Sequence, residues 1–192
     1  MNEDSAPTIF FTLYFDTTTE DSIRNYWQRL AQAGIRVPGL SGLRPHVTLA
    51  ACTTDAIGQH CALLADFVQA HAAFPIGFDH LGVFPSSRVV FLAPRVTAQL
   101  TLVQSALVRM LGAADRTTMK FTEHLAPDKW IPHCTLVVGS TAELSTAISS
   151  LLAQPWQPIV GMVIGIGIVV APDVDDLVRY PFAHSGTARS IP

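Results

Sequence analysis

One five-residue motif occurs twice in this sequence, and this repeat limits the possible folds more than any other feature. Pro-His-Val-Thr-Leu occupies residues 45–49 and Pro-His-Cys-Thr-Leu occupies residues 132–136. Each copy is predicted to open a strand after its proline, because proline cannot donate to the middle of a sheet ladder. Each strand leads into a helical pattern about seven or eight residues after its histidine. A second chance copy is expected on the order of once in a few hundred such sequences. The repeat therefore favours an internal duplication, with both motifs at the centre of a pseudo-symmetric fold.

The motif places one imidazole and one hydroxyl on the same face of each predicted strand. Residues two apart in a strand project to the same side, so His46 lies with Thr48, and His133 with Thr135. A single pair of this kind is usually solvated or buried with hydrogen-bond partners, since burial without partners costs about 1–3 kcal/mol. Two pairs at equivalent places instead favour a polar cleft lined by both.

These residue types suit the cleavage of a phosphodiester bond. In-line displacement needs a base for the attacking oxygen and an acid for the departing one, and histidine supplies either near neutral pH. Threonine hydroxyls donate hydrogen bonds to the non-bridging phosphoryl oxygens. The candidate catalytic set is therefore His46, Thr48, His133 and Thr135. We expect no metal and no other cofactor.

The paired motifs resemble those of the 2H phosphoesterase superfamily. Within it, RPHVTLA, SSRVVFLAP and WIPHCTLV are most similar to the bacterial 2′-5′ RNA ligase family, related to the RNA 2′,3′-cyclic phosphodiesterases, roughly over residues 8–170. The resemblance implies an α+β, bilobal, pseudo-two-fold fold, with two antiparallel sheets facing a central cleft and helices outside. It also implies hydrolysis of cyclic or 2′-5′ phosphodiester bonds in nucleotides or RNA ends, or their ligation in reverse. Which histidine is the acid and which the base stays open.

The remaining sequence alternates strand and helix patterns. Residues 8–16 alternate so that Ile9, Phe11, Leu13 and Phe15 share a core-facing side. Further strands are predicted at 74–84, 88–96, 159–171 and 176–183, and helices at 19–34, 55–72, 98–111 and 140–153. Residues 113–129 show no clear period and are predicted to form a loop. We expect residues 1–192 to form one domain of two intertwined halves.

Composition narrows the function and the location of the protein. Hydrophobic residues make up 49% of the 192 residues and charged residues 14%, as in a globular protein. The net charge of −3 argues against a protein that coats nucleic acid. Three cysteines without a CxxC pair, and a start without a signal-like pattern, indicate a cytoplasmic protein. The most apolar run, residues 159–171, is shorter than the roughly 20 residues that cross a bilayer, so we expect no membrane association.

Six residues near the motifs are candidate substrate ligands. Arg44 shares the side of His46 and is a candidate for binding phosphate, as are Arg88 at a hairpin tip and Lys129 before the second motif. Trp130 follows Lys129 and is a similar candidate. Phe10 and Tyr14 face away from the core side of their strand and are candidates to stack on a base, although packing under a helix is an equal alternative.

The C-terminal third contains two further patterns. In the run GMVIGIGIVV, the even-numbered residues from Met162 to Val170 are predicted to fill the core. The opposite side carries Gly161, Gly165 and Gly167, and either admits a close backbone or leaves room for a ligand. The acidic cluster Asp173, Asp175 and Asp176 is predicted to be a solvated turn, because it lacks the glycine and distal glutamate of a calcium loop.

The leading hypothesis is a metal-independent phosphodiesterase whose partner is a nucleotide or RNA terminus carrying a cyclic or 2′-5′ phosphodiester. No obligate protein partner is predicted. The alternatives are a nucleotide- or RNA-end-binding module with little turnover, or an RNA 2′-5′ ligase. Two intact histidine–threonine pairs favour the enzyme over the binding module.

Overall fold

The computed structural model describes residues 6–114, 119–120, 125, 128–153, 155–171 and 175–183. Within these ranges the helices are α1 (Thr17–Gln32), α2 (Ile57–Gln69), α3 (Ala98–Ala114) and α4 (Thr141–Leu152), with a short 3-10 helix η1 (Pro38–Ser41). The strands are β1 (Thr8–Phe15), β2 (Val47–Thr53), β3 (Phe74–Phe84), β4 (Val89–Pro94), β5 (Met119–Lys120), β6 (Cys134–Val138), β7 (Ile159–Ala171) and β8 (Asp175–Pro181). Much of the predicted loop at 113–129 lies outside the described residues. No described helix is long and apolar enough to cross a membrane.

The strands form one antiparallel sheet in the order β5-β2-β1-β7-β3-β4-β6, and β8 also pairs with β7. The long strand β7 pairs with β1 along one edge. Its first part pairs with β3, and its second part with β8, along the other edge. The predicted α+β class with antiparallel strands is therefore confirmed, and the two expected sheets are continuous through β7.

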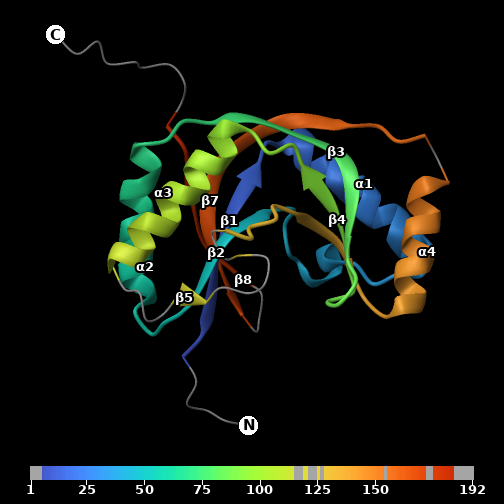
Figure 1. The fold of residues 1–192 in the computed structure, drawn as a ribbon, viewed down its shortest axis with the longest axis horizontal. Coiled ribbons are helices and arrows are strands. Elements are labelled where there is room, and N and C mark those ends of the chain that lie inside the picture. Colours follow the sequence, from blue (N-terminus) through green and yellow to red (C-terminus); the bar gives the residue numbers. More distant parts are fainter. Residues whose placement is uncertain are drawn as a thin grey trace.

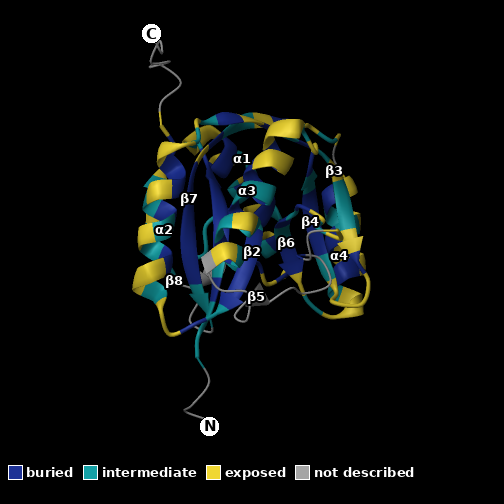
Figure 2. Cartoon of the chain, turned by 60° about the vertical axis from the view of Figure 1, so that its left-hand side comes forward, coloured by how far each residue is buried: buried dark blue, intermediate teal, exposed yellow. Residues whose placement is uncertain are grey.

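The helices lie outside the sheet, as Figure 1 shows. Helix α2 packs on β7 and β8, and α3 packs on β2. Helix α1 packs on β7 and on α4, which in turn covers β4 and β6. Figure 2 shows the result: the strands are largely buried, while the outer sides of the helices are exposed.

The sheet curls so that its two motif strands meet. Strands β2 and β6 lie near opposite ends of the sheet order, yet they contact each other without pairing. A flat sheet would hold them five strand spacings apart, or roughly 24 Å. The curl therefore brings the two copies of the repeated motif to the same place.

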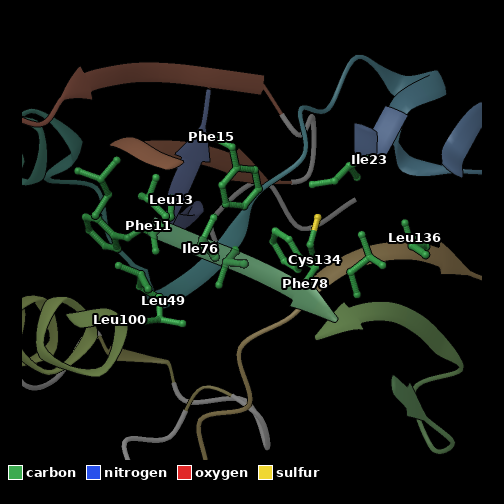
Figure 3. Close-up of a cluster of buried hydrophobic side chains, with 14 of the residues drawn as sticks. Phe11, Leu13, Phe15, Ile23, Leu49, Ile76, Phe78, Leu100, Cys134 and Leu136 are labelled. Carbon is green, nitrogen blue, oxygen red and sulfur yellow. The ribbon is translucent and has the colours of Figure 1, made fainter. Parts of the chain in front are cut away.

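The core follows the predicted alternation of β1. Ile9, Phe11, Leu13 and Phe15 are fully buried, which confirms their predicted core side. Figure 3 shows three of these side chains, Phe11, Leu13 and Phe15, in one cluster with residues of β2, β3 and β6. The rings of Phe15 and Phe78 meet edge to face with centroids 5.5 Å apart, a geometry that aromatic pairs favour.

The predicted alternation of β7 is wrong in one place. Ile166 and Ile168 are buried as predicted, but Ile164 is 41% exposed and Val163 is fully buried. The cause is a register shift against β1, which pairs Tyr14 with Gly165 but Phe15 with Val163. One residue more on β7 than on β1 is a β-bulge, and a bulge reverses which residues face the core.

Side chains set the starts of two helices. Asp16 is the N-cap of α1, where its carboxylate accepts the backbone N–H of Thr19 at 2.8 Å. Helix α1 therefore begins two residues before the predicted Thr19. The predicted capping box is confirmed at α4, where Ser140 and Glu143 each accept a backbone N–H from the other.

Candidate active site

The two motif histidines are oriented by the same local hydrogen bond. The Nδ1 of His46 bonds to the carbonyl oxygen of Arg44 at 2.7 Å, and that of His133 to the carbonyl oxygen of Ile131 at 2.8 Å. A carbonyl only accepts, so Nδ1 carries the proton in both rings and Nε2 is the basic nitrogen of each neutral imidazole. The repeat in the sequence is thus a repeat in side-chain geometry.

Two tryptophans brace the backbone of the motif strands. The indole N–H of Trp130 donates to the carbonyl of Thr48 at 3.1 Å, and that of Trp27 to the carbonyl of Thr135 at 3.1 Å. Trp27 lies in α1, ahead of the first motif, and braces the second motif. Trp130 lies just ahead of the second motif and braces the first. Each indole therefore ties the two halves of the chain together beside a motif threonine.

The motifs also touch directly through Cys134, the middle residue of the second His-Cys-Thr. Its thiol receives a hydrogen bond from the backbone N–H of His46, and burial raises the pKa of the thiol to about 12. A thiol that keeps its proton is a small, uncharged group at the contact between the strands. It holds β2 and β6 together and has no use as a nucleophile there.

Burial and nearby polar groups act in opposite directions on the pKa of His46. Burial lowers its pKa, while the hydrogen bond to the Arg44 carbonyl and the negative charge of Asp176 oppose that shift. The net direction is downward, so the neutral ring is favoured at neutral pH. A neutral imidazole whose Nε2 holds a lone pair can accept a proton.

His133 has different neighbours from His46. Its ring meets Phe84 of β3 edge to face, with centroids 5.0 Å apart, and the tilted ring of Phe91 of β4 at 5.4 Å. These contacts fix the plane of the imidazole through packing. The two histidines therefore share a backbone hydrogen bond but differ in their surroundings.

Comparison with known proteins identifies the family. The family model of the 2′-5′ RNA ligase superfamily matches residues 19–175, which include both motifs. The chain belongs to the 2′-5′ RNA ligase superfamily. The resemblance to the 2H phosphoesterases, drawn from the motifs, is thereby confirmed. Membership also makes the protein one of a group that acts on phosphodiester bonds. No curated protein matches the chain.

Solved structures share the fold of this superfamily member. A phosphoesterase structure has a TM-score of 0.60 at 18% identity, and TT0787 of Thermus thermophilus a TM-score of 0.60 at 16% identity; each match covers 93% of this chain and 99% of the other. E. coli LigT in its apo form gives a TM-score of 0.58 at 18% identity, again over 93% and 99%. Other LigT structures contain 3′-AMP, ATP, NADP+ or phosphate.

In this superfamily member, Arg44 is held by a buried carboxylate. Its guanidinium forms a bidentate pair with Glu20 of α1, with Nη2–Oε1 at 2.5 Å and Nε–Oε2 at 3.2 Å. Glu20 is 2% exposed and also pairs with Arg24 at 3.1 Å. Two arginines compensate the cost of burying that charge. The sequence reasoning missed Glu20, whose signal was its place in the first turn of a helix.

The other predicted ligands lie in different settings. Tyr14 is 3% exposed, with the guanidinium groups of Arg44 and Arg179 at 5.4 and 5.9 Å from its ring centre. The ring is therefore buried and already in contact with two guanidinium groups, and the stacking of Tyr14 on a base stays a prediction. Phe10 is half-buried in β1, so its role stays a prediction.

The remaining candidates are split between surface and core. Arg88 is exposed at the turn between β3 and β4 with a φ of 54°, and Lys129 is exposed ahead of the second motif. Trp130 instead packs against the core and directs its indole N–H to the backbone of β2. In the part of the chain that the structure describes, no group of three His, Cys, Asp or Glu side chains is arranged to hold a metal.

Proposed function

We propose that this protein is a metal-independent phosphodiesterase that hydrolyses 2′,3′-cyclic or 2′-5′ phosphodiester bonds in nucleotides or at RNA ends. The observation that supports it best is the matched orientation of the two imidazoles. Both histidines donate Nδ1–H to a backbone carbonyl two residues earlier, on strands that contact each other. We propose that the two Nε2 atoms, on these neighbouring motifs, act as the acid and the base of an in-line displacement.

The reaction follows from these groups. One neutral imidazole accepts the proton of the attacking water at Nε2 as the new bond to phosphorus forms. The other, protonated, gives its proton to the departing ribose oxygen as that bond breaks. The hydroxyls of Thr48 and Thr135 donate to the non-bridging oxygens, where negative charge is held in the transition state. For a cyclic phosphate, the product is one ribose that carries both a free hydroxyl and a phosphomonoester. For a 2′-5′ bond, one fragment carries the new hydroxyl and the other carries the phosphomonoester.

Nearby charges and contacts support a nucleotide-sized anionic substrate. Arg44 lies two residues before His46, and its pair with Glu20 uses Nε and Nη2 but not Nη1. We propose that Arg44 binds a phosphate oxygen. Arg88 and Lys129 are exposed cations and are proposed to contact the rest of the substrate. E. coli LigT, similar in fold, has been crystallised with nucleotides. None of the three cysteines forms a disulfide, which fits the reducing cytoplasm that we propose as the location.

The test is turnover by the chelator-treated protein. Substrates are 2′,3′-cyclic nucleotides, a 2′-5′ dinucleotide and an RNA with a cyclic end, each with wild type, His46→Ala and His133→Ala. We expect hydrolysis by wild type and a loss of about 10²-fold or more in each variant. His80→Ala is the matched control, since His80 is an exposed histidine paired with Asp79, and it should retain activity. Nucleotide binding without turnover would favour a binding module, joined RNA ends would favour a ligase, and loss of activity on chelation would contradict the metal-independent mechanism.

A further inference from the structure

Helix α1 contacts both copies of the repeated motif, or their immediate surroundings, through two buried side chains. Trp27 donates to the carbonyl of Thr135 in the second motif. Glu20 accepts from the guanidinium of Arg44, the residue just ahead of the first motif. Glu20 and Trp27 are both buried, about two helical turns and roughly 10 Å apart along the axis, so they share a side of the helix. One helix therefore links the two motifs.

The first turn of α1, which carries Glu20, is fixed to β7 by hydrogen bonds and by close packing. The backbone N–H of Asp16 donates to the carbonyl of Met162 at 3.0 Å, and the Asp16 carboxylate accepts the backbone N–H of Met162 at 2.6 Å. Thr19 packs on Gly161, where a Cβ would overlap the threonine hydroxyl. Glu20 is buried in this turn, so its carboxylate extends from a fixed backbone.

Arg44 is held between the carboxylate of Glu20 and the ring of Tyr14. Its Nε and Nη2 both donate to Oε1 of Glu20, and Nε also lies 3.2 Å from Oε2. On another side, its guanidinium carbon lies 5.4 Å from the centre of the Tyr14 ring, within the range of a cation–π contact. A two-point pair and a ring contact together restrict a side chain that otherwise has many rotamers.

Tyr14 is itself fixed by β7 and β8. A Cβ at Gly167 would lie 2.6 Å from its ring, so the ring rests on bare backbone there. The Tyr14 hydroxyl donates to Oδ1 of Asp176 at 2.5 Å. Asp176, expected in a solvated turn, is instead a half-buried strand residue. The glycine side of β7, expected to admit a close backbone or a ligand, admits the Tyr14 ring and the carbonyl of Val178 at Gly167.

The carbonyl of Arg44 is the group that orients the ring of His46. It accepts Nδ1–H at 2.7 Å. A neutral histidine in water favours the tautomer with its proton on Nε2, so this bond keeps the proton on Nδ1. The side chain and the carbonyl belong to one residue, so a fixed guanidinium limits the rotation of that carbonyl. His133 is oriented through Ile131, whose side chain has no charge and forms no such pair.

We propose that Glu20 is a positioning residue, which acts through Arg44 to hold the His46 ring with Nδ1 on the Arg44 carbonyl, so that Nε2 is the nitrogen that gives or takes a proton. This inference rests on the proposed function and makes it more specific. Stability alone does not account for the pair, because apolar residues of similar volume often stabilise a fold as well as a buried ion pair does. A pair that fixes one orientation of a reacting group serves catalysis through geometry.

The test is NMR of the ring nitrogens in the free protein, at a pH where both imidazoles are neutral, together with kcat. The 15N shifts distinguish a protonated from an unprotonated ring nitrogen. In Glu20→Gln, which keeps the shape and removes the charge, we expect His46 to shift from Nδ1–H toward Nε2–H while His133 keeps its wild-type signals. We expect kcat to fall about tenfold. Glu20→Asp keeps the charge and should recover part of both effects.

Arg44→Lys tests the same link from the other partner. Lysine keeps the positive charge but lacks the planar fork that binds both carboxylate oxygens. The Arg44 side chain is 26% exposed, and Glu20 stays paired with Arg24, so this variant remains informative if Glu20→Gln folds poorly. We expect the His46 signals to shift in the same direction as in Glu20→Gln.

Asp21→Asn is the matched control, because Asp21 is the next residue of α1, its side chain is 64% exposed and it lies 3.8 Å from Arg24. It should leave both histidines and kcat unchanged. If His46 keeps Nδ1–H in folded Glu20→Gln and Arg44→Lys, or if His133 changes as much as His46, the inference is overturned. The NMR measurement needs no substrate. Turnover with an unmoved His46 would reject the positioning role alone, and a shifted His46 without any turnover would count against the proposed function alone.

Discussion

The brace between Trp27 and the second motif can be tested by removing one hydrogen bond. Trp27 is 4% exposed and donates to the Thr135 carbonyl at 3.1 Å. In Trp27→Phe the ring contacts largely persist, but the carbonyl loses its indole donor. A lost hydrogen bond costs about 0.5–1.5 kcal/mol, and a buried group left without a partner about 1–3 kcal/mol. We therefore expect the free energy of unfolding to fall by about 1–3 kcal/mol.

Urea denaturation measures this change, and Trp156→Phe is its control. The indole nitrogen of Trp156 is buried without a hydrogen-bond partner among the described residues. Its replacement by Phe removes a similar ring volume and no hydrogen bond, so the loss of stability should be distinctly smaller. We also expect kcat to fall about tenfold or more in Trp27→Phe alone, since Thr135 would shift. Equal destabilisation by both variants would refute the bracing role of the indole N–H.

Two further predictions concern the contacts that hold the site in place. Burial raises the pKa of the Cys134 thiol from 9.0 to about 12 in the folded protein. Above pH 9 the thiol therefore loses its proton in the unfolded chain but keeps it in the folded one. The free energy of unfolding should fall by about 1.4 kcal/mol per pH unit in that range. Cys134→Ala should show a flatter dependence in urea denaturation across that range, and an equally steep one would contradict this assignment. A Cβ at Gly161 would overlap the hydroxyl oxygen of Thr19, so Gly161→Ala should separate α1 from β7 at a cost of about 2–4 kcal/mol. Gly58→Ala in α2 meets no atom within 4 Å and should be neutral or stabilising; equal effects of the two in thermal denaturation would rule out the steric argument.

The parts of the fold that could be predicted are those determined by residues close together in the sequence. The alternation of β1 follows from the two-residue period of a strand, and the capping box of α4 from the spacing of Ser140 and Glu143. The hairpin of β3 and β4 follows from the turn residues between them. The repeated motif also identified the family, because its chemistry requires both copies.

The parts that could not be predicted depend on residues far apart in the sequence. Trp27 reaches Thr135 across 108 positions, and Tyr14 reaches Asp176 across 162. Nothing local distinguishes Asp176 from a solvated carboxylate, and nothing local shows that the indole N–H of Trp130 donates to the backbone of Thr48. The bulge of β7 could not be predicted either, because the apolar residues of β7 are compatible with more than one register against β1. Such features depend on contacts between distant segments, which form only in the folded chain.

The most direct test of the account is a double-mutant comparison of the two motif histidines. The kcat values of wild type, His46→Ala, His133→Ala and the double variant are measured on one substrate in the presence of chelator. If both rings act in one step at one site, each single variant should lose about as much activity as the double variant, because groups that act together are strongly non-additive. Independent losses that multiply in the double variant, or a single variant close to wild type, would contradict the claim that the two motifs form one active site.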